Sequence, residues 1–139
     1  MDAGDYEGTR TGLTQMIHLD TNLLIALLDE SHSHASIAES LISLKEPLGC
    51  SSLAWMELHS KPIPRSSTLL LIEILSGGIA PFTWEEAELS GELFQKTGNL
   101  RRLRFDCAIA ASALKKNCKL ATANTKDFQY FVPWGLQLL

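Results

Sequence analysis

Acidic and amide side chains follow apolar runs at four widely separated places in this 139-residue chain. They are Asp20 in IHLDTN, Glu57 in LAWMELHS, Asp106 in RFDCAIAASAL, and Asn124 with Asp127 in LATANTKDF. A carboxylate beside an apolar run is costly unless a proton, a partner or a cation neutralises it. Brought together at one edge of a sheet, these oxygen atoms would form a site for Mg²⁺ or Mn²⁺. The pattern therefore predicts a divalent metal site built from segments that are remote in sequence.

Taken singly, most of these residues have a plainer explanation. Asp106 alone is better explained as a helix N-cap, Glu57 equally well as a solvated helix residue, and Asp127 as a turn or cap residue. Asp20 is the strongest single candidate, because a carboxylate that ends a buried strand is hard to explain as structure. Taken jointly, the four positions favour a shared site over their separate explanations.

The elements that must position these side chains alternate short apolar runs with helical periods, a pattern typical of a parallel sheet covered on both faces. Strands are expected at 16–19, 48–53, 79–82, 119–122 and 136–138. Helices are expected at 21–29, 34–45, 54–60, 66–75, 84–96 and 105–116, the first capped by Thr21 or Asn22. Ligands of such sheets bind beyond the carboxyl ends of the strands, where strand order reverses. Asp20 and Asn124 would share that rim if their strands are neighbours.

Composition indicates one globular domain, with 45% hydrophobic and 20% charged residues. No apolar stretch approaches the length of a membrane span, so no membrane segment is expected. We predict a flexible extension over 1–15, which is polar and glycine-rich, and a single domain over 16–139. The three cysteines have no metal-ligand spacing and are expected to be buried free thiols, as in a reducing cytoplasm.

The net charge of −4 argues against a nucleic-acid partner, but the distribution of charge does not. Residues 1–60 contain two basic and nine acidic side chains, whereas residues 61–139 contain ten basic and seven acidic ones. Basic residues flank Asp106 on both sides, namely Arg101, Arg102, Arg104, Lys115, Lys116 and Lys119. Such groups beside carboxylates fit a phosphate-bearing substrate held partly through metal. Lys115 and Lys116 are better explained as solvated residues at a helix C-terminus.

These motifs resemble those of PIN-domain ribonucleases, most closely the VapC-type toxins of VapBC toxin–antitoxin pairs. The resemblance covers about 16–139 and is carried by LDTNLLIALL, AWMEL, FDCAIAASAL and LATANTKDF in this order. It implies an α/β fold with three layers, α/β/α, around a central parallel sheet of about five strands. It also implies Mg²⁺- or Mn²⁺-dependent endonucleolytic cleavage of RNA, a homodimer and a cognate antitoxin partner. The segment between Glu57 and Ser76 is shorter than usual in these toxins, which weakens the implied partner contacts.

The resemblance assigns metal binding and catalysis to individual residues. Asp20, Glu57 and Asp106 match the family's acidic triad and would hold the ion. Asn124 stands where many members have a fourth acid. Its amide can position a water but supplies no charge, which leaves a second metal ion open.

Two further residues are expected to contact the substrate. Thr21 would bond a carboxylate or a phosphate, and Arg104 would neutralise the RNA backbone. The predicted reaction is in-line attack by a metal-activated water, which leaves a 5′-phosphate and a 3′-hydroxyl.

Two other functions fit parts of the pattern. The missing fourth acid at Asn124 fits a catalytically weak or inactive PIN-like module that binds RNA or protein. Alternatively, Asp20 could be the nucleophile of a haloacid-dehalogenase-type phosphatase. Those enzymes require a second aspartate two residues later, where this chain has Asn22.

Overall fold

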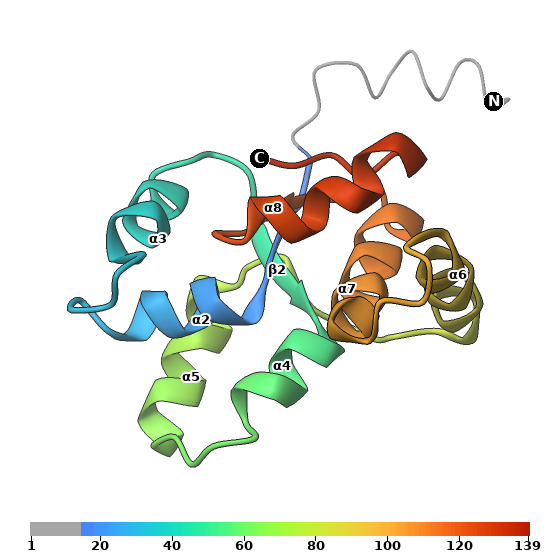
Figure 1. Ribbon diagram of the computed structural model, residues 1–139. Coiled ribbons are helices and arrows are strands. Elements are labelled where there is room, and N and C mark those ends of the chain that lie inside the picture. The colour runs from blue at the N-terminus through green and yellow to red at the C-terminus, as the bar shows by residue number, and fades with distance from the viewer. Residues whose placement is uncertain (1–14) are drawn as a thin grey trace, which may run out of the picture.

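Within residues 15–139, which the computed structural model describes, the chain forms the predicted α/β/α arrangement (Figure 1). The extension predicted over 1–15 lies outside the described residues, except for Gln15. The sheet of this part has four strands, all parallel, in the order β3-β2-β1-β4. Their bounds are Ile17–Leu19 for β1, Leu48–Ser51 for β2, Gly78–Ala80 for β3 and Lys119–Ala121 for β4.

The fifth predicted strand, at 136–138, is reduced to a single parallel bridge between Leu138 and Leu120. The backbone N–H of Leu120 donates to Gln137 O at 2.9 Å, and the N–H of Leu139 donates to Leu120 O at 3.0 Å. The prediction of about five strands therefore holds for the fold class, while the last strand is limited to this one pairing beside β4.

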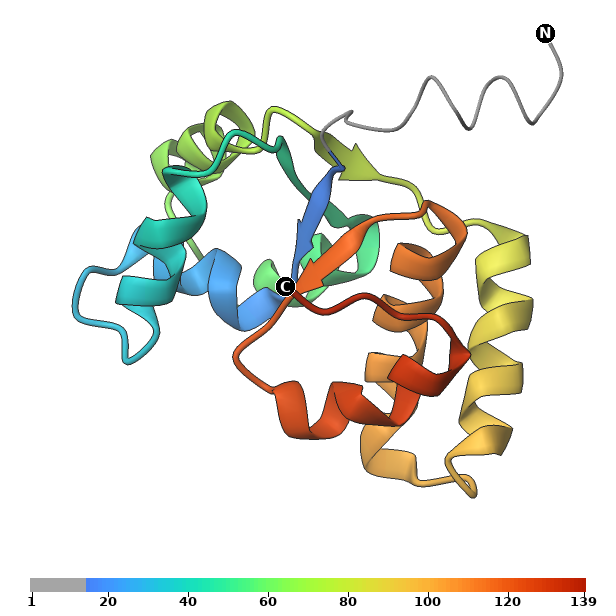
Figure 2. The same ribbon diagram turned by 90° about the horizontal axis from the view of Figure 1, so that it is seen from above.

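Helices cover both faces of the sheet (Figure 2). One side carries α6 (Trp84–Lys96) and α7 (Arg104–Lys115), and the other carries α2 (Thr21–Leu28), α3 (Ala35–Ile42) and α5 (Arg65–Ile74). The short helix α4 (Ser52–Leu58) starts directly at the carboxyl end of β2. After β4 the chain forms α8 (Thr125–Phe128) and the 3₁₀ helix η2 (Gln129–Trp134), and a second 3₁₀ helix, η1 (Arg101–Leu103), leads into α7. No helix of this part is long and apolar enough to cross a bilayer.

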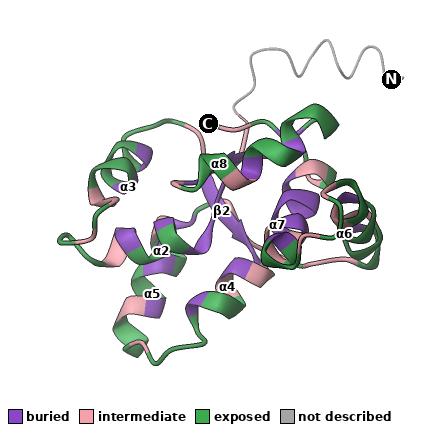
Figure 3. Ribbon diagram, in the orientation of Figure 1, coloured by how far each residue is buried: buried purple, intermediate pink, exposed green. Residues whose placement is uncertain are grey.

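The core lies where the inner faces of these helices meet the strands (Figure 3). Helix α7 presents a stripe of buried alanines, Ala110, Ala111 and Ala113, to the interior. Small side chains let a helix approach a sheet closely, which brings the N-terminal turn of α7 to the carboxyl end of the strands. Phe128 and Phe131 fill the core beneath α8 and η2. The three cysteines are buried free thiols, as predicted.

Most boundaries differ from the predicted ones by one to three residues, and two of these differences matter for the site. Strand β2 stops at Ser51, whose hydroxyl accepts the N–H of Ala54 at 3.2 Å and so caps α4. A serine can end a strand and begin a helix in one residue, which the apolar run up to Leu53 concealed. Helix α7 begins at Arg104, so Asp106 lies in its first turn and is not its N-cap.

Candidate functional site

The rim that collects the candidate residues lies at the carboxyl ends of β1 and β4. These strands pair directly, with His18 opposite Leu120 and Leu19 opposite Ala121. The N–H of Asp20 extends the ladder by donating to Ala121 O at 3.2 Å. The chain leaves β1 for β2 on one side and reaches β4 on the other, so the strand order reverses at β1. This is the position where parallel sheets bind their ligands.

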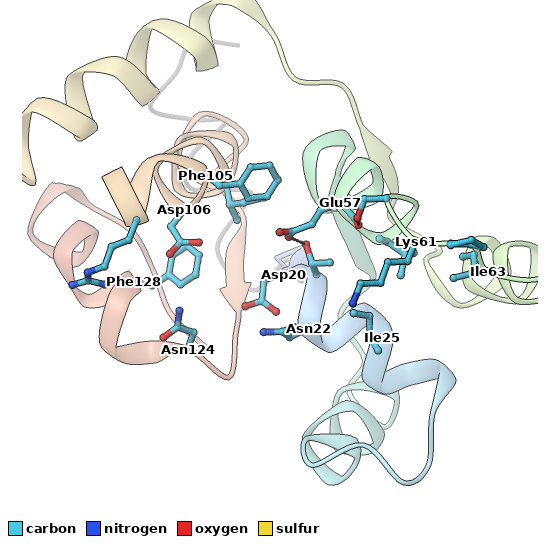
Figure 4. Close-up of a pocket in the computed structure, with 16 residues that line it drawn as sticks. Asp20, Asn22, Ile25, Glu57, Lys61, Ile63, Phe105, Asp106, Asn124 and Phe128 are labelled. Atoms are coloured by element: carbon cyan, nitrogen blue, oxygen red, sulfur yellow. Dashed lines mark hydrogen bonds between the residues drawn. The ribbon is translucent and has the colours of Figure 1, made fainter. Parts of the chain in front are cut away.

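A pocket of about 640 Å³ opens at this rim. Its walls include Asp20, Thr21, Glu57, Asp106 and Asn124, which come from four separate segments of the chain. Figure 4 shows Glu57 on one side of the pocket, Asp106 and Asn124 on the other, and Asp20 between them. The structure thus brings five of the six predicted site residues to one pocket.

Asp20 is held by two hydrogen bonds at the end of β1. Its side chain is the N-cap of α2 and accepts the N–H of Leu23 at 3.2 Å, a role the sequence analysis assigned to Thr21 or Asn22. Its other oxygen, Oδ2, accepts the hydroxyl of Thr122. Burial raises the pKa of Asp20, the two hydrogen bonds oppose that rise, and the charge of Glu57 adds to it. The hydrogen bonds fix the carboxylate in place, but its burial disfavours the charged form.

The hydroxyl of Thr21 donates to Glu57 Oε1 and so links α2 to α4 across the pocket. This is the carboxylate contact expected of Thr21. Because the α4 helix begins directly after β2, Glu57 reaches the rim from a short and rigid element. Thr21 therefore orients the carboxylate of Glu57.

The pKa of Asp106 reflects the burial and the negative charges of the pocket. The pKa of Asp106 is raised to about 6, mainly by burial and also by the charges of Asp127, Asp20 and Glu57, while the charge of Arg102 lowers it. These carboxylates lie near enough to repel one another. A bound cation would relieve this repulsion, as would a proton on Asp106.

Asn124 is tied to Asp127 one helical turn later. Its Nδ2 donates to Asp127 Oδ2 at 3.0 Å, and Arg102 Nη1 donates to Asp127 Oδ1 at 2.5 Å. Asp127 is therefore a member of the first turn of α8, as its expected structural role suggested, and also a link between η1 and α8. These two hydrogen bonds lower its pKa, so the carboxylate stays ionised.

Thr122 is the contact residue that sequence reasoning missed. It is 8% exposed, donates to Asp20 Oδ2 and accepts the N–H of Asn124 at 2.9 Å. The available signal was a hydroxyl two residues before Asn124, at the end of a buried strand. Such residues commonly bond the backbone two residues ahead.

Arg104 does not line this pocket. Its guanidinium stacks over the ring of Phe94, 4.8 Å from the centroid, and it borders a neighbouring hollow together with Arg101 and Arg102. Arg102 and Lys61 line the pocket instead. All three arginines of this run border the neighbouring hollow, and Arg102 alone among them also lines the pocket.

The donor set fits a hard divalent cation in kind, because all of its members offer oxygen atoms. Among residues 15–139, however, no three His, Cys, Asp or Glu side chains form a ready-made metal cluster. An ion here would contact one or two carboxylates directly and the others through water, an arrangement that Mg²⁺ commonly adopts. Burial raises the pKa of both Asp20 and Asp106, and neighbouring carboxylates add to the rise, so a cation bound at these two residues would offset both effects.

Comparison with known proteins agrees with this architecture. The chain resembles a toxin–antitoxin complex from Klebsiella pneumoniae at 27% identity, covering 83% of this chain and 90% of that one, with a TM-score of 0.62. It resembles VapBC-1 from nontypeable Haemophilus influenzae at 25% identity, covering 89% and 96%, with a TM-score of 0.60. It shares its fold with VapBC2 from Rickettsia felis bound to a promoter DNA fragment, at 22% identity, covering 89% and 97%, with a TM-score of 0.68.

A search of curated proteins finds no significant match. The family model of the PIN domain matches residues 17–131, which include every strand of the described sheet and every candidate site residue. The resemblance inferred from the motifs is thereby confirmed, and the chain belongs to the PIN domain family.

Proposed function

We propose that this protein is a Mg²⁺- or Mn²⁺-dependent endoribonuclease and the toxin component of a VapBC-type pair. The observation that carries the proposal is the pocket at the rim of β1 and β4, which gathers oxygen donors from four remote segments. PIN domains are generally nucleases, which supports hydrolysis of a phosphodiester bond. The similarity to toxin–antitoxin complexes supports the biological role.

Asp20 and Asp106 would hold the ion, directly or through water, and Glu57 would bind it or orient the nucleophile. When bound, the ion supplies an acidified water and polarises the scissile phosphate. The chain supplies orientation. Thr21 keeps Glu57 Oε1 turned toward α2, and Thr122 holds Asp20 Oδ2.

Asn124 would position the attacking water through its amide. Since Nδ2 is engaged by Asp127, the amide oxygen is the atom left to accept a hydrogen bond. In-line attack would leave a 5′-phosphate and a 3′-hydroxyl. One bound ion suffices for this scheme, because Asn124 adds no charge for a second.

The proposal is tested by incubating purified protein with a mixed RNA pool and Mn²⁺, beside an Asp20→Asn variant. We expect cleavage by the natural protein, suppression by EDTA, and a loss of at least about 100-fold in the variant, because removing an electrostatic group at a reacting centre has effects of this size. Equal cleavage by both proteins would expose a contaminant and leave no support for the site. Cleavage by neither would overturn the nuclease assignment.

The second outcome would favour the alternative, a PIN-like module that binds without hydrolysis. Two observations support this alternative. The described residues contain no ready-made cluster of three acidic ligands, and Asn124 stands where a fourth acid is common in the family. Retained RNA binding without cleavage would establish it.

Helix α5 offers a surface for the proposed protein partners. Leu71 is fully buried, whereas Leu69, Leu70 and Ile72 are each about half exposed, at 50%, 47% and 46%. Within residues 69–75 (LLLIEIL), one face of the helix packs into the core and the opposite, apolar face is exposed. Such a face fits the proposed homodimer or antitoxin contact. Light scattering of the purified protein, with Leu70→Gln as the variant, tests the homodimer, which the variant is expected to weaken.

A further inference from the structure

The lining of the pocket contains two basic side chains among the described residues, Lys61 and Arg102, and neither belongs to the proposed catalytic set. Lys61 follows the end of α4, and Arg102 lies in η1 just before α7. In Figure 4 Lys61 lies on the same side of the pocket as Glu57, across Asp20 from Asp106 and Asn124. Arg102 belongs to the opposite wall, because it binds Asp127, the partner of Asn124. The two cations therefore flank the carboxylates from opposite sides.

The ion pair with Asp127 does not account for the position of Arg102. Its side chain is 56% exposed, and an exposed pair of this kind contributes little to stability. A guanidinium has five donors, and the hydrogen bond to Asp127 Oδ1 engages a single nitrogen, Nη1. Asp127 is itself held through its other oxygen by Asn124. This chain of contacts holds the guanidinium at the pocket wall, with N–H donors left over for the two non-bridging oxygens of a phosphodiester.

Lys61 is exposed and forms no ion pair among residues 15–139, where the ion pairs are Arg102–Asp127 and Lys116–Glu86. Pro62 and Pro64 restrict the backbone immediately after Lys61, which limits where the backbone of the lysine can move. A long flexible ammonium at a pocket mouth suits a phosphate that it binds as a point charge.

We propose that Lys61 and Arg102 bind the two backbone phosphates that flank the reacting phosphate of a single-stranded RNA, one on each side, so that the strand crosses the pocket from the α4 wall to the α7 wall. This inference rests on the proposed nuclease function and names the residues that set the path of its substrate. The three carboxylates of the lining repel RNA, and these two cations offset that repulsion on both sides of the reacting phosphate.

The test is equilibrium binding of a fluorescent 12-nucleotide RNA, measured by anisotropy over a series of salt concentrations. Binding is measured in EDTA, and again with Mg²⁺ in an Asp20→Asn background, so that neither measurement depends on cleavage. The variants are Lys61→Gln and Arg102→Gln. Their matched controls are Lys115→Gln, at the far end of α7, and Arg101→Gln, the neighbour that borders the adjacent hollow but does not line the pocket.

Each phosphate contact to a single strand contributes about 0.7 to the slope of log affinity against log salt. We expect each pocket variant to weaken binding about 3- to 30-fold at low salt. Each should also make the negative slope shallower by about 0.7, and the double variant should make it shallower by about twice as much. Arg102→Lys keeps the charge and should keep the slope. The controls should remain close to the natural protein.

An unchanged slope in both pocket variants, an equal loss in all four variants, or no RNA binding under either condition would overturn the proposal. The nuclease assignment fails separately, since it is decided by Mn²⁺-dependent cleavage. If the protein cleaves RNA but its RNA binding does not depend on the charges of Lys61 and Arg102, the nuclease function stands and the proposed RNA path is wrong.

Discussion

At the scale of single residues, Thr122 holds two parts of the candidate site in register, since it donates to Asp20 Oδ2 and accepts the N–H of Asn124 at 2.9 Å. We expect Thr122→Val to lower Mn²⁺ affinity or cleavage about 10- to 100-fold, the usual cost of losing a partner that orients a metal ligand. Calorimetric titration with Mn²⁺ measures the affinity. Thr122→Ser keeps the hydroxyl and should retain most of it; equal losses in both variants would assign Thr122 a packing role instead.

Asp106 offers a residue-scale prediction with a pH signature. Burial and neighbouring carboxylates raise its pKa to about 6, above the ordinary value of 3.8, so the fold disfavours its charged form at neutral pH. Because Asp106 is partly exposed and solvent screens its charge, Asp106→Asn should raise the free energy of unfolding at pH 7.5 by about 1–2 kcal/mol. The variant's advantage should shrink as the pH falls through 6 toward 4, because the natural residue then becomes protonated.

Urea denaturation in EDTA at pH 7.5 and pH 5 measures this difference. EDTA matters, because a bound cation would reverse the preference for the charged form. A variant that is less stable than the natural protein at pH 7.5 would show that the carboxylates do not repel one another as described.

At the scale of elements, α6 and α7 are joined by a buried ion pair. Glu86 is 2% exposed, its Oε2 accepts Lys116 Nζ, and Lys116 also donates to Pro81 O at 2.9 Å. From the sequence, Lys116 is expected to be a solvated residue at a helix end, and this prediction is wrong. Local patterns describe a residue's own helix, and they carry no information about a partner 30 positions away in the chain.

Lys116→Met should destabilise the protein by about 3–5 kcal/mol, because it leaves the buried carboxylate of Glu86 uncompensated. The double variant Glu86→Gln with Lys116→Met should recover part of this loss. Lys115→Met, at the exposed neighbouring position, should change the free energy of unfolding by less than about 0.5 kcal/mol. Denaturant titration measures the free energy of unfolding of the three variants. If Lys116→Met lowers it no more than Lys115→Met does, the ion pair adds no stability.

The same contrast explains which elements could be predicted. Apolar periodicity located the helices α2 to α7 and four strands within a few residues, because it reflects burial along one element, but it did not predict α8 or the two 3₁₀ helices. The cap of α2 by Asp20 and the end of β2 at Ser51 depend on single hydrogen bonds, to Leu23 and Ala54, that a pattern of apolar residues does not contain. The orientation of Arg104 toward Phe94 depends likewise on a contact from another helix.

At the scale of the whole molecule, the position of β1 between β2 and β4 makes the site. It brings Asp20 beside the segment after β4, and it allows α4 and α7 to approach from the two sides. The motifs could suggest that their carboxylates converge, because parallel strands end at one rim. They could not supply the polar contacts around them, such as Thr122 and Lys61, since these follow from the spatial order of the strands.

The most direct test of the central claim is a crystal structure of the Mn²⁺-soaked protein with anomalous differences recorded at the manganese edge. The account predicts one strong peak in the pocket, within direct or water-mediated reach of the carboxylates of Asp20 and Asp106. A peak elsewhere, or none in the pocket at millimolar Mn²⁺, would contradict it.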